Sequence, residues 1–145
     1  MLGRKIAEIS NSGQLTPFWF ASYLFEEALF KLGDEEGMIF EGVGRKVEEA
    51  KLFHEIMSFL GRDYRIFNLE TSEDTVSGRL KKRSLVSGRE DDHGDKLVTR
   101  FKHFDEHTSS ALKFFDEKGK VVHIDGEPLP EIVHASVMAE LQKLN

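Results

Sequence analysis

Short apolar runs alternate along this chain with longer segments whose apolar residues recur at helical spacing. The runs are 38–40 (Met-Ile-Phe), 64–69 and 121–124, and the stretches between them are long enough to hold a helix. Strands joined by such helices pair in parallel through right-handed crossovers, and the helices cover both faces of the sheet. The sequence therefore predicts an α/β fold with a parallel sheet sandwiched by helices.

Helical spacing and capping residues give the expected helices. They are 1–12, a second helix that begins at Pro17 and ends before Gly33, 46–60, 72–82 with Ser72 as N-cap, 95–118 and 130–144. A polar loop is expected at 84–94. No linker, repeat or low-complexity tract interrupts the chain, so residues 1–145 are predicted to form a single domain.

Composition excludes several classes of protein. The 145 residues contain no cysteine, so disulfides and thiolate zinc sites are ruled out. The net charge of -6 argues against a general nucleic-acid-binding protein. No apolar run approaches the roughly 20 residues of a membrane span, and no signal-peptide segment is visible. A soluble, cytoplasmic protein that binds neither nucleic acid nor membrane is expected.

Arginines are placed where loops leave strands or enter helices, which suits phosphate binding because a guanidinium forms two parallel bonds to phosphate oxygens. Arg45 follows the first apolar run through Gly42 and Gly44. The other candidates are Arg79 and Arg83 at i, i+4 spacing, Arg89 in the polar loop, and Arg100 in the long helix. Each feature alone is most often a solvated side chain or a helix cap, but their order along one α/β chain favours a phosphate site.

With these residues in view, the chain from about Leu2 resembles the later two-thirds of an adenylate kinase, of the short-lid type. The matching segments are 13–17 (Gly-Gln-Leu-Thr-Pro), 40–45 (Phe-Glu-Gly-Val-Gly-Arg), 79–83 (Arg-Leu-Lys-Lys-Arg), 88–92 (Gly-Arg-Glu-Asp-Asp) with Arg100, and 124–128 (Ile-Asp-Gly-Glu-Pro). The family's glycine-rich phosphate loop, with its first strand and first helix, has no counterpart in this sequence. The resemblance implies a P-loop nucleoside-monophosphate-kinase-like fold without those parts.

The resemblance also implies roles for individual residues. The resemblance assigns the catalytic contacts with the transferred phosphoryl group to Arg45, Arg89 and Arg100. The acceptor nucleotide falls to Gly13, Gln14, Leu15, Thr16, Gly42, Arg45 and Glu49, and the donor nucleotide to Arg79, Arg83, Gly126, Glu127 and Pro128. Residues 1–32 would then form the acceptor-nucleotide-binding helices, and 33–145 the remainder of the core with a shortened lid at about 84–94.

Three positions depart from the family's pattern, and the composition of the lid bears on metal use. Glu41 stands where the family has aspartate, and it would reach Mg²⁺ through water beside the nucleotide phosphates. Gly44 replaces a proline, and Glu49 replaces a glutamine that reads the acceptor base. The short lid carries no zinc-binding cysteines, so Mg²⁺ but no zinc is expected.

The missing strand leads to a further expectation. In the family it lies between the strands that correspond to 38–41 and 64–69. These two segments must therefore pair directly, accept a strand from another molecule, or leave their edges unpaired. We expect self-association, or a complementing phosphate-loop segment, at this gap.

Three functions remain open from sequence. In the first, the chain is the AMP-, ADP- and ATP-binding region of an adenylate-kinase-like phosphotransferase whose phosphate loop comes from a larger protein or complex. Alternatively it is an inactive nucleotide- or anion-binding remnant, or it is an interaction domain whose arginines pair only with nearby carboxylates. Alone, the chain is expected to be inactive or very weak.

Overall fold

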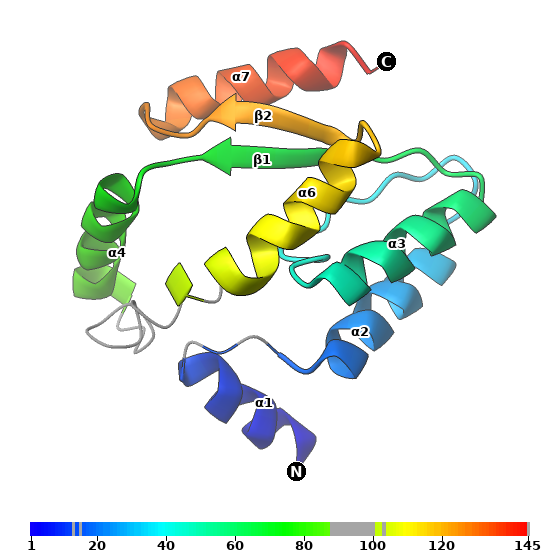
Figure 1. Cartoon of the computed structure of the whole chain (residues 1–145), viewed down its shortest axis with the longest axis horizontal. Coiled ribbons are helices and arrows are strands. Elements are labelled where there is room, and N and C mark those ends of the chain that lie inside the picture. Colours follow the sequence, from blue (N-terminus) through cyan, green and yellow to red (C-terminus); the bar gives the residue numbers. More distant parts are fainter. Residues whose placement is uncertain (13, 15, 88–100, 103, 145) are drawn as a thin grey trace.

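The computed structural model describes residues 1–12, 14, 16–87, 101–102 and 104–144 (Figure 1). Its elements, in chain order, are α1 (Leu2–Asn11), α2 (Phe18–Phe30), α3 (Val47–Phe59), β1 (Ile66–Glu70), α4 (Glu73–Ser87), the π-helical turn η2 (Phe104–Thr108), α6 (Ser109–Glu117), β2 (Val121–Asp125) and α7 (Pro130–Gln142). None of the described helices combines the length and the apolarity needed to cross a membrane.

The strands β1 and β2 pair in parallel, with Ile66 opposite Val121 and Glu70 opposite Asp125. Helix α7 packs on β2, and α6 packs between β2 and α3, which in turn contacts α2 (Figure 1). The predicted parallel sheet flanked by helices is confirmed, and the strands expected at 64–69 and 121–124 are present within two residues of their predicted ends.

The prediction of a strand at 38–40 is wrong. Residues 36–40 run without regular secondary structure, and Ile39 is 94% exposed. Only Phe40 turns inward, where its ring makes an edge-on contact with Phe53 at 6.0 Å between centroids. In the described chain no strand lies beside this segment, so its backbone has no ladder to join and an apolar run alone does not become a strand.

The predicted start of the polar loop, at residue 84, is also wrong. Helix α4 continues to Ser87, five residues beyond the predicted end at Lys82. The remainder of that loop and the first part of the helix expected at 95–118 lie outside the described residues. The described remainder of that helix is the π-helical turn η2 followed by α6.

The core is aromatic and lies where α2, α3 and α6 meet. Its buried members are Phe25, Leu29, Ala50, Phe53, Met57, Ala111 and Phe115. Phe53 makes edge-on contacts with Phe25, Tyr64 and Phe115, at centroid distances of 5.7, 5.1 and 6.5 Å. Such pairs add about 0.5–1.5 kcal/mol each beyond their buried area. This cluster holds the base of the 41–46 loop, which carries Arg45.

Candidate functional site

The loop 41–46 is shaped by two glycines in left-handed conformation, Gly42 with φ 80° and Gly44 with φ 74°. Arg45 folds its guanidinium over Gly42, since a Cβ there would lie 3.1 Å from Nη2 of Arg45. The Arg45 side chain is exposed, and none of the ion pairs within the described chain involves it. A cation displayed in this way is able to meet an anion from solvent.

Glu49 ties this loop to the start of α3. Its carboxylate accepts a hydrogen bond from the backbone N–H of Arg45 at 3.2 Å, and the side chain is only 4% exposed. Burial raises the pKa of Glu49, while the Lys46 charge and the N–H groups of residues 45 and 46 act in the opposite direction. The resemblance assigns Glu49 to the acceptor base, whereas in this structure its carboxylate is hydrogen-bonded to the backbone N–H of Arg45.

Among the described residues, a hydrogen bond from Lys46 joins the loop to the predicted acceptor segment. Lys46 Nζ donates to the carbonyl oxygen of Thr16 at 3.3 Å. The structure therefore brings Thr16 together with the loop of Arg45 and Glu49, which are about 30 residues away along the chain. Two other predicted acceptor residues, Gly13 and Leu15, lie outside the described residues.

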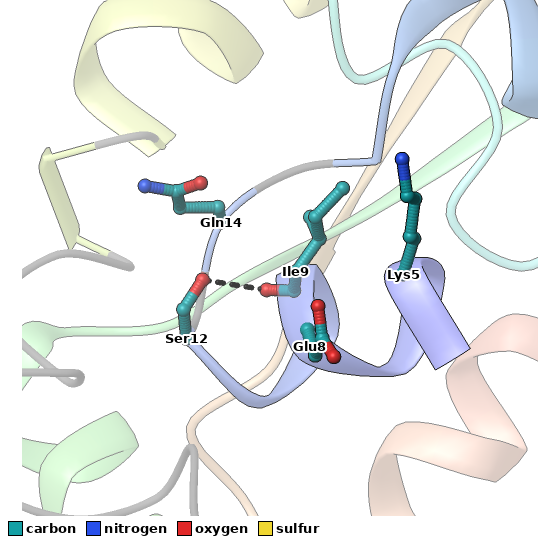
Figure 2. A pocket seen from close by; sticks show the side chains of 5 residues that line it. All are labelled: Lys5, Glu8, Ile9, Ser12 and Gln14. Atoms are coloured by element: carbon teal, nitrogen blue, oxygen red, sulfur yellow. Dashed lines mark hydrogen bonds between the residues drawn. The ribbon is translucent and has the colours of Figure 1, made fainter. Parts of the chain in front are cut away.

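Gln14 faces a different part of the surface. Together with Lys5, Glu8, Ile9 and Ser12 it lines a hollow of about 450 Å³ on the side of α1 (Figure 2). Ser12 closes the end of α1 there by donating its hydroxyl to the carbonyl of Ile9 at 2.7 Å. Among the described residues, Arg45, Thr16 and Glu49 do not line this hollow.

The predicted donor residues gather at the carboxyl ends of the two strands. Arg79 of α4 donates from Nη1 to the carbonyl of Gly126 at 2.7 Å, and from Nη2 to the carbonyls of Glu127 and Pro128 at 2.9 Å each. Four of the five predicted donor residues therefore meet at one turn. Arg83, the fifth, lies one helical turn further along α4, and Glu41 is exposed in the 41–46 loop.

Glu127 reaches back from this turn to the first turn of α4. Its carboxylate accepts from the backbone N–H of Ser72 and, at 2.6 Å, from the hydroxyl of Thr75. The Thr75 hydroxyl, followed by the Ser72 N–H, lowers the pKa of Glu127. Ser72 caps the helix as predicted, with its Oγ accepting from the Thr75 N–H at 3.3 Å. The roles of Thr75 and of the Glu127 carboxylate were missed, although a hydroxyl in the first turn of a helix is a common partner for an acidic residue.

The remaining predicted residues are outside what the structure describes or stand apart. Arg89 and Arg100 lie outside the described residues, as do the aspartates of the 88–92 segment. Within the described chain, no group of three histidine, cysteine, aspartate or glutamate side chains could hold a metal ion. One carboxylate such as Glu41 fits Mg²⁺ only together with nucleotide phosphates, which is the usual way that proteins bind this ion.

A parallel sheet flanked by helices, with Arg79 bound to the turn that follows β2, defines an α/β protein, and this arrangement is consistent with a nucleoside-monophosphate-kinase-like fold. No protein-family model matches the chain. Individual proteins do match, at 27% identity over 144 residues with an adenylate kinase of Azobacteroides pseudotrichonymphae and 29% over 143 residues with adenylate kinase 1 of Schistosoma mansoni. A third match, at 29% identity, is an adenylate kinase of Maricaulis maris.

These alignments cover 97–99% of this chain and 71–76% of the relatives. The chain is therefore related to the adenylate kinases over nearly its whole length.

Proposed function

We propose that this chain is the acceptor- and transfer-side region of an adenylate-kinase-like phosphotransferase, which converts ATP and AMP to two ADP in the family. Its relatives are named adenylate kinases, and the match extends over nearly all of this chain. The observation that carries the proposal is the loop of Arg45, an exposed cation on two left-handed glycines that Lys46 joins to Thr16. Residues 1–32 would bind the acceptor nucleotide, and 33–145 would form the remaining core with a short lid at about 84–94.

In this proposal Arg45 holds the acceptor phosphate, and Arg89 and Arg100 join it on the transferred phosphoryl group. Phosphoryl transfer depends mainly on positioning and on positive charge around the reacting oxygens, which these side chains would supply. When bound with the nucleotide, Mg²⁺ would neutralise phosphate charge near Glu41. A cytoplasmic location, where both nucleotides are available, belongs to the same proposal.

We further propose that the reaction needs a complementing phosphate-loop segment or a second copy of the chain. β1 pairs only with β2 among the described residues, so its other edge has no strand beside it. Helix α7 buries no residue, and Ile132 and Met138 on it are 55% and 43% exposed.

Calorimetric titration with AMP tests the acceptor site. We expect Arg45→Gln to weaken AMP binding at least about tenfold. Lys51→Gln removes the same charge from the exposed side of α3 and is expected to change the affinity less than about twofold. Equal effects of the two substitutions would contradict a specific phosphate contact at Arg45.

A coupled assay for ADP tests the enzymatic part. The isolated chain is expected to give no turnover, and adding the phosphate-loop half of an adenylate kinase is expected to restore it. Light scattering on the isolated chain distinguishes self-association from the need for a separate half. Nucleotide binding without turnover in any combination would favour an inactive binding remnant, and no binding at all would favour an interaction domain.

A further inference from the structure

The turn 125–128 is held to the β1–α4 segment by contacts from both sides. The Gly126 N–H donates to the carbonyl of Glu70 at 2.7 Å, and the Glu127 N–H donates to the Asp125 carboxylate at 2.9 Å. Gly126 is buried so closely that a Cβ would lie 2.6 Å from Oγ1 of Thr71 and 2.8 Å from the Glu70 carbonyl oxygen. The backbone of this turn is therefore fixed before any ligand arrives.

Arg79 and Glu127 connect the turn and α4 in opposite directions. Arg79, on α4, donates to the three successive carbonyls of 126–128, whereas Glu127, on the turn, accepts from Ser72 and Thr75 at the start of α4. Carboxylates are favourable at the N-terminus of a helix, and a guanidinium suits several carbonyls at once because its donors lie in one plane. The two contacts make the turn and the first two turns of α4 one unit.

The hydrogen-bond geometry also limits what else Arg79 can do. A guanidinium binds phosphate with two parallel bonds, either through both terminal nitrogens or through Nε and Nη2. Nη2 already donates to two carbonyls, so it has no further hydrogen to offer. Binding phosphate with two parallel bonds would therefore require Arg79 to give up at least one of these bonds and to release part of the turn.

We propose that Arg79 is a positioning residue, which together with Glu127 fixes the backbone of 126–128 for the donor base and makes no contact with the donor phosphates. This inference rests on the proposed function for the identity of the ligand, but its structural part does not. Removing Arg79 is then expected to affect ligands that contain the base and to spare ligands that consist only of phosphate.

Titrations with adenosine, ATP and inorganic tripolyphosphate test this distinction. For Arg79→Met we expect the affinities for adenosine and ATP to fall about tenfold, and the affinity for tripolyphosphate to change less than about twofold. Arg62→Met is the matched control, because Arg62 also donates to backbone carbonyls, at Gly33 and Glu36, but far from this turn. A loss of tripolyphosphate affinity equal to the loss for ATP would overturn the proposal.

Hydrogen exchange at the Gly126 amide tests the positioning role without any nucleotide. We expect Arg79→Met and Glu127→Gln each to speed this exchange at least about tenfold, and the double variant to gain less than the two effects combined because both side chains hold the same turn. Unchanged exchange in both single variants would overturn the proposal. If the wild-type chain binds none of the three ligands, the proposed function fails while the exchange measurement still decides whether Arg79 holds the turn.

Discussion

The ring of Phe115 in α6 lies directly against Gly44 in the loop that carries Arg45. Phe115 is 1% exposed, and a Cβ on residue 44 would lie 3.0 Å from its Cε2 and 3.1 Å from its Cζ. The buried aromatic cluster therefore fixes how closely the 41–46 loop packs against α6. The side chain that we expect to bind phosphate follows immediately in sequence, so core packing and ligand binding are coupled at this point.

Replacing Gly44 with proline, the residue of the family motif, is expected to destabilise this chain. Proline fixes φ near −65°, but residue 44 has φ 74°. We expect a loss of about 3 kcal/mol or more in the free energy of unfolding, measured by urea denaturation. A stable Gly44→Pro variant would mean that the loop readily adopts another backbone path.

The cost of displacing the Phe115 ring can be measured separately from the cost of placing a side chain at a positive φ. Gly61 also has a positive φ, 64°, but a Cβ there would meet no atom within 4 Å. Gly61→Ala should therefore cost only the conformational penalty, about 1–2 kcal/mol, whereas Gly44→Ala should add about 1 kcal/mol or more for displacement of the ring. Equal losses in the two variants would show that Phe115 moves aside without cost.

The sequence predicted the parts of the fold that depend on local pattern. Helical spacing and caps located the helices, and the apolar runs at 64–69 and 121–124 became paired strands. The run at 38–40 has a similar pattern, but strand formation also needs a neighbour, and the described chain provides none beside it. Apolar character alone could not reveal whether a partner strand was available.

For the predicted donor residues, the sequence could name the residues but not the contacts between them. Arg79 and the 126–128 turn were both expected near the donor nucleotide, and the structure does bring them together. That the guanidinium faces the carbonyls of that turn depends on how α4 packs after β1, which no local spacing encodes. For Glu49 the resemblance predicts a contact with the acceptor base, and the sequence could not show that this side chain is buried against its own loop.

Gly126→Ala is expected to separate β2 from the end of β1. The added Cβ would meet Oγ1 of Thr71 and the Glu70 backbone, and the backbone cannot rotate away as a side chain can. We expect a loss of about 1–3 kcal/mol in unfolding free energy. Gly78→Ala is the control, since residue 78 lies in α4, where a Cβ would meet no atom within 4 Å, and the substitution should stabilise the chain by up to about 1 kcal/mol. The idea fails if both substitutions change stability in the same direction.

Asp63 is expected to titrate unusually low. The Lys120 ammonium, at 2.6 Å, and the Arg65 guanidinium, at 2.7 Å, lower the pKa of its carboxyl to about 2. Because the pKa is depressed in the folded chain, the associated stability is present at neutral pH and is lost as the pH falls toward that value. A carbon-detected NMR titration measures the pKa directly, and Lys120→Met should raise it toward the ordinary range of aspartate. An unchanged pKa in that variant would show that Lys120 is not the main cause.

Glu49 should give the opposite dependence on pH. Burial raises its pKa, so the folded chain holds this proton more tightly than the unfolded chain does. Its contribution to stability is therefore complete at low pH and is lost as the pH rises through the raised pKa. Glu49→Gln keeps an oxygen to accept from the Arg45 N–H but carries no charge, so its unfolding free energy should change less between about pH 5 and about pH 8 than that of the wild type.

Glu48→Gln is the control for Glu49, because Glu48 lies next to it on α3 but is exposed, and it should retain the wild-type pH dependence. Glu49→Ala removes the hydrogen bond as well as the charge and should lose about 1 kcal/mol relative to Glu49→Gln. If Glu49 instead served mainly to read a base, both substitutions would weaken AMP binding without changing how stability depends on pH. Denaturant unfolding at the two pH values, together with AMP titration of the same variants, distinguishes a carboxylate that holds the Arg45 loop from one that contacts the ligand.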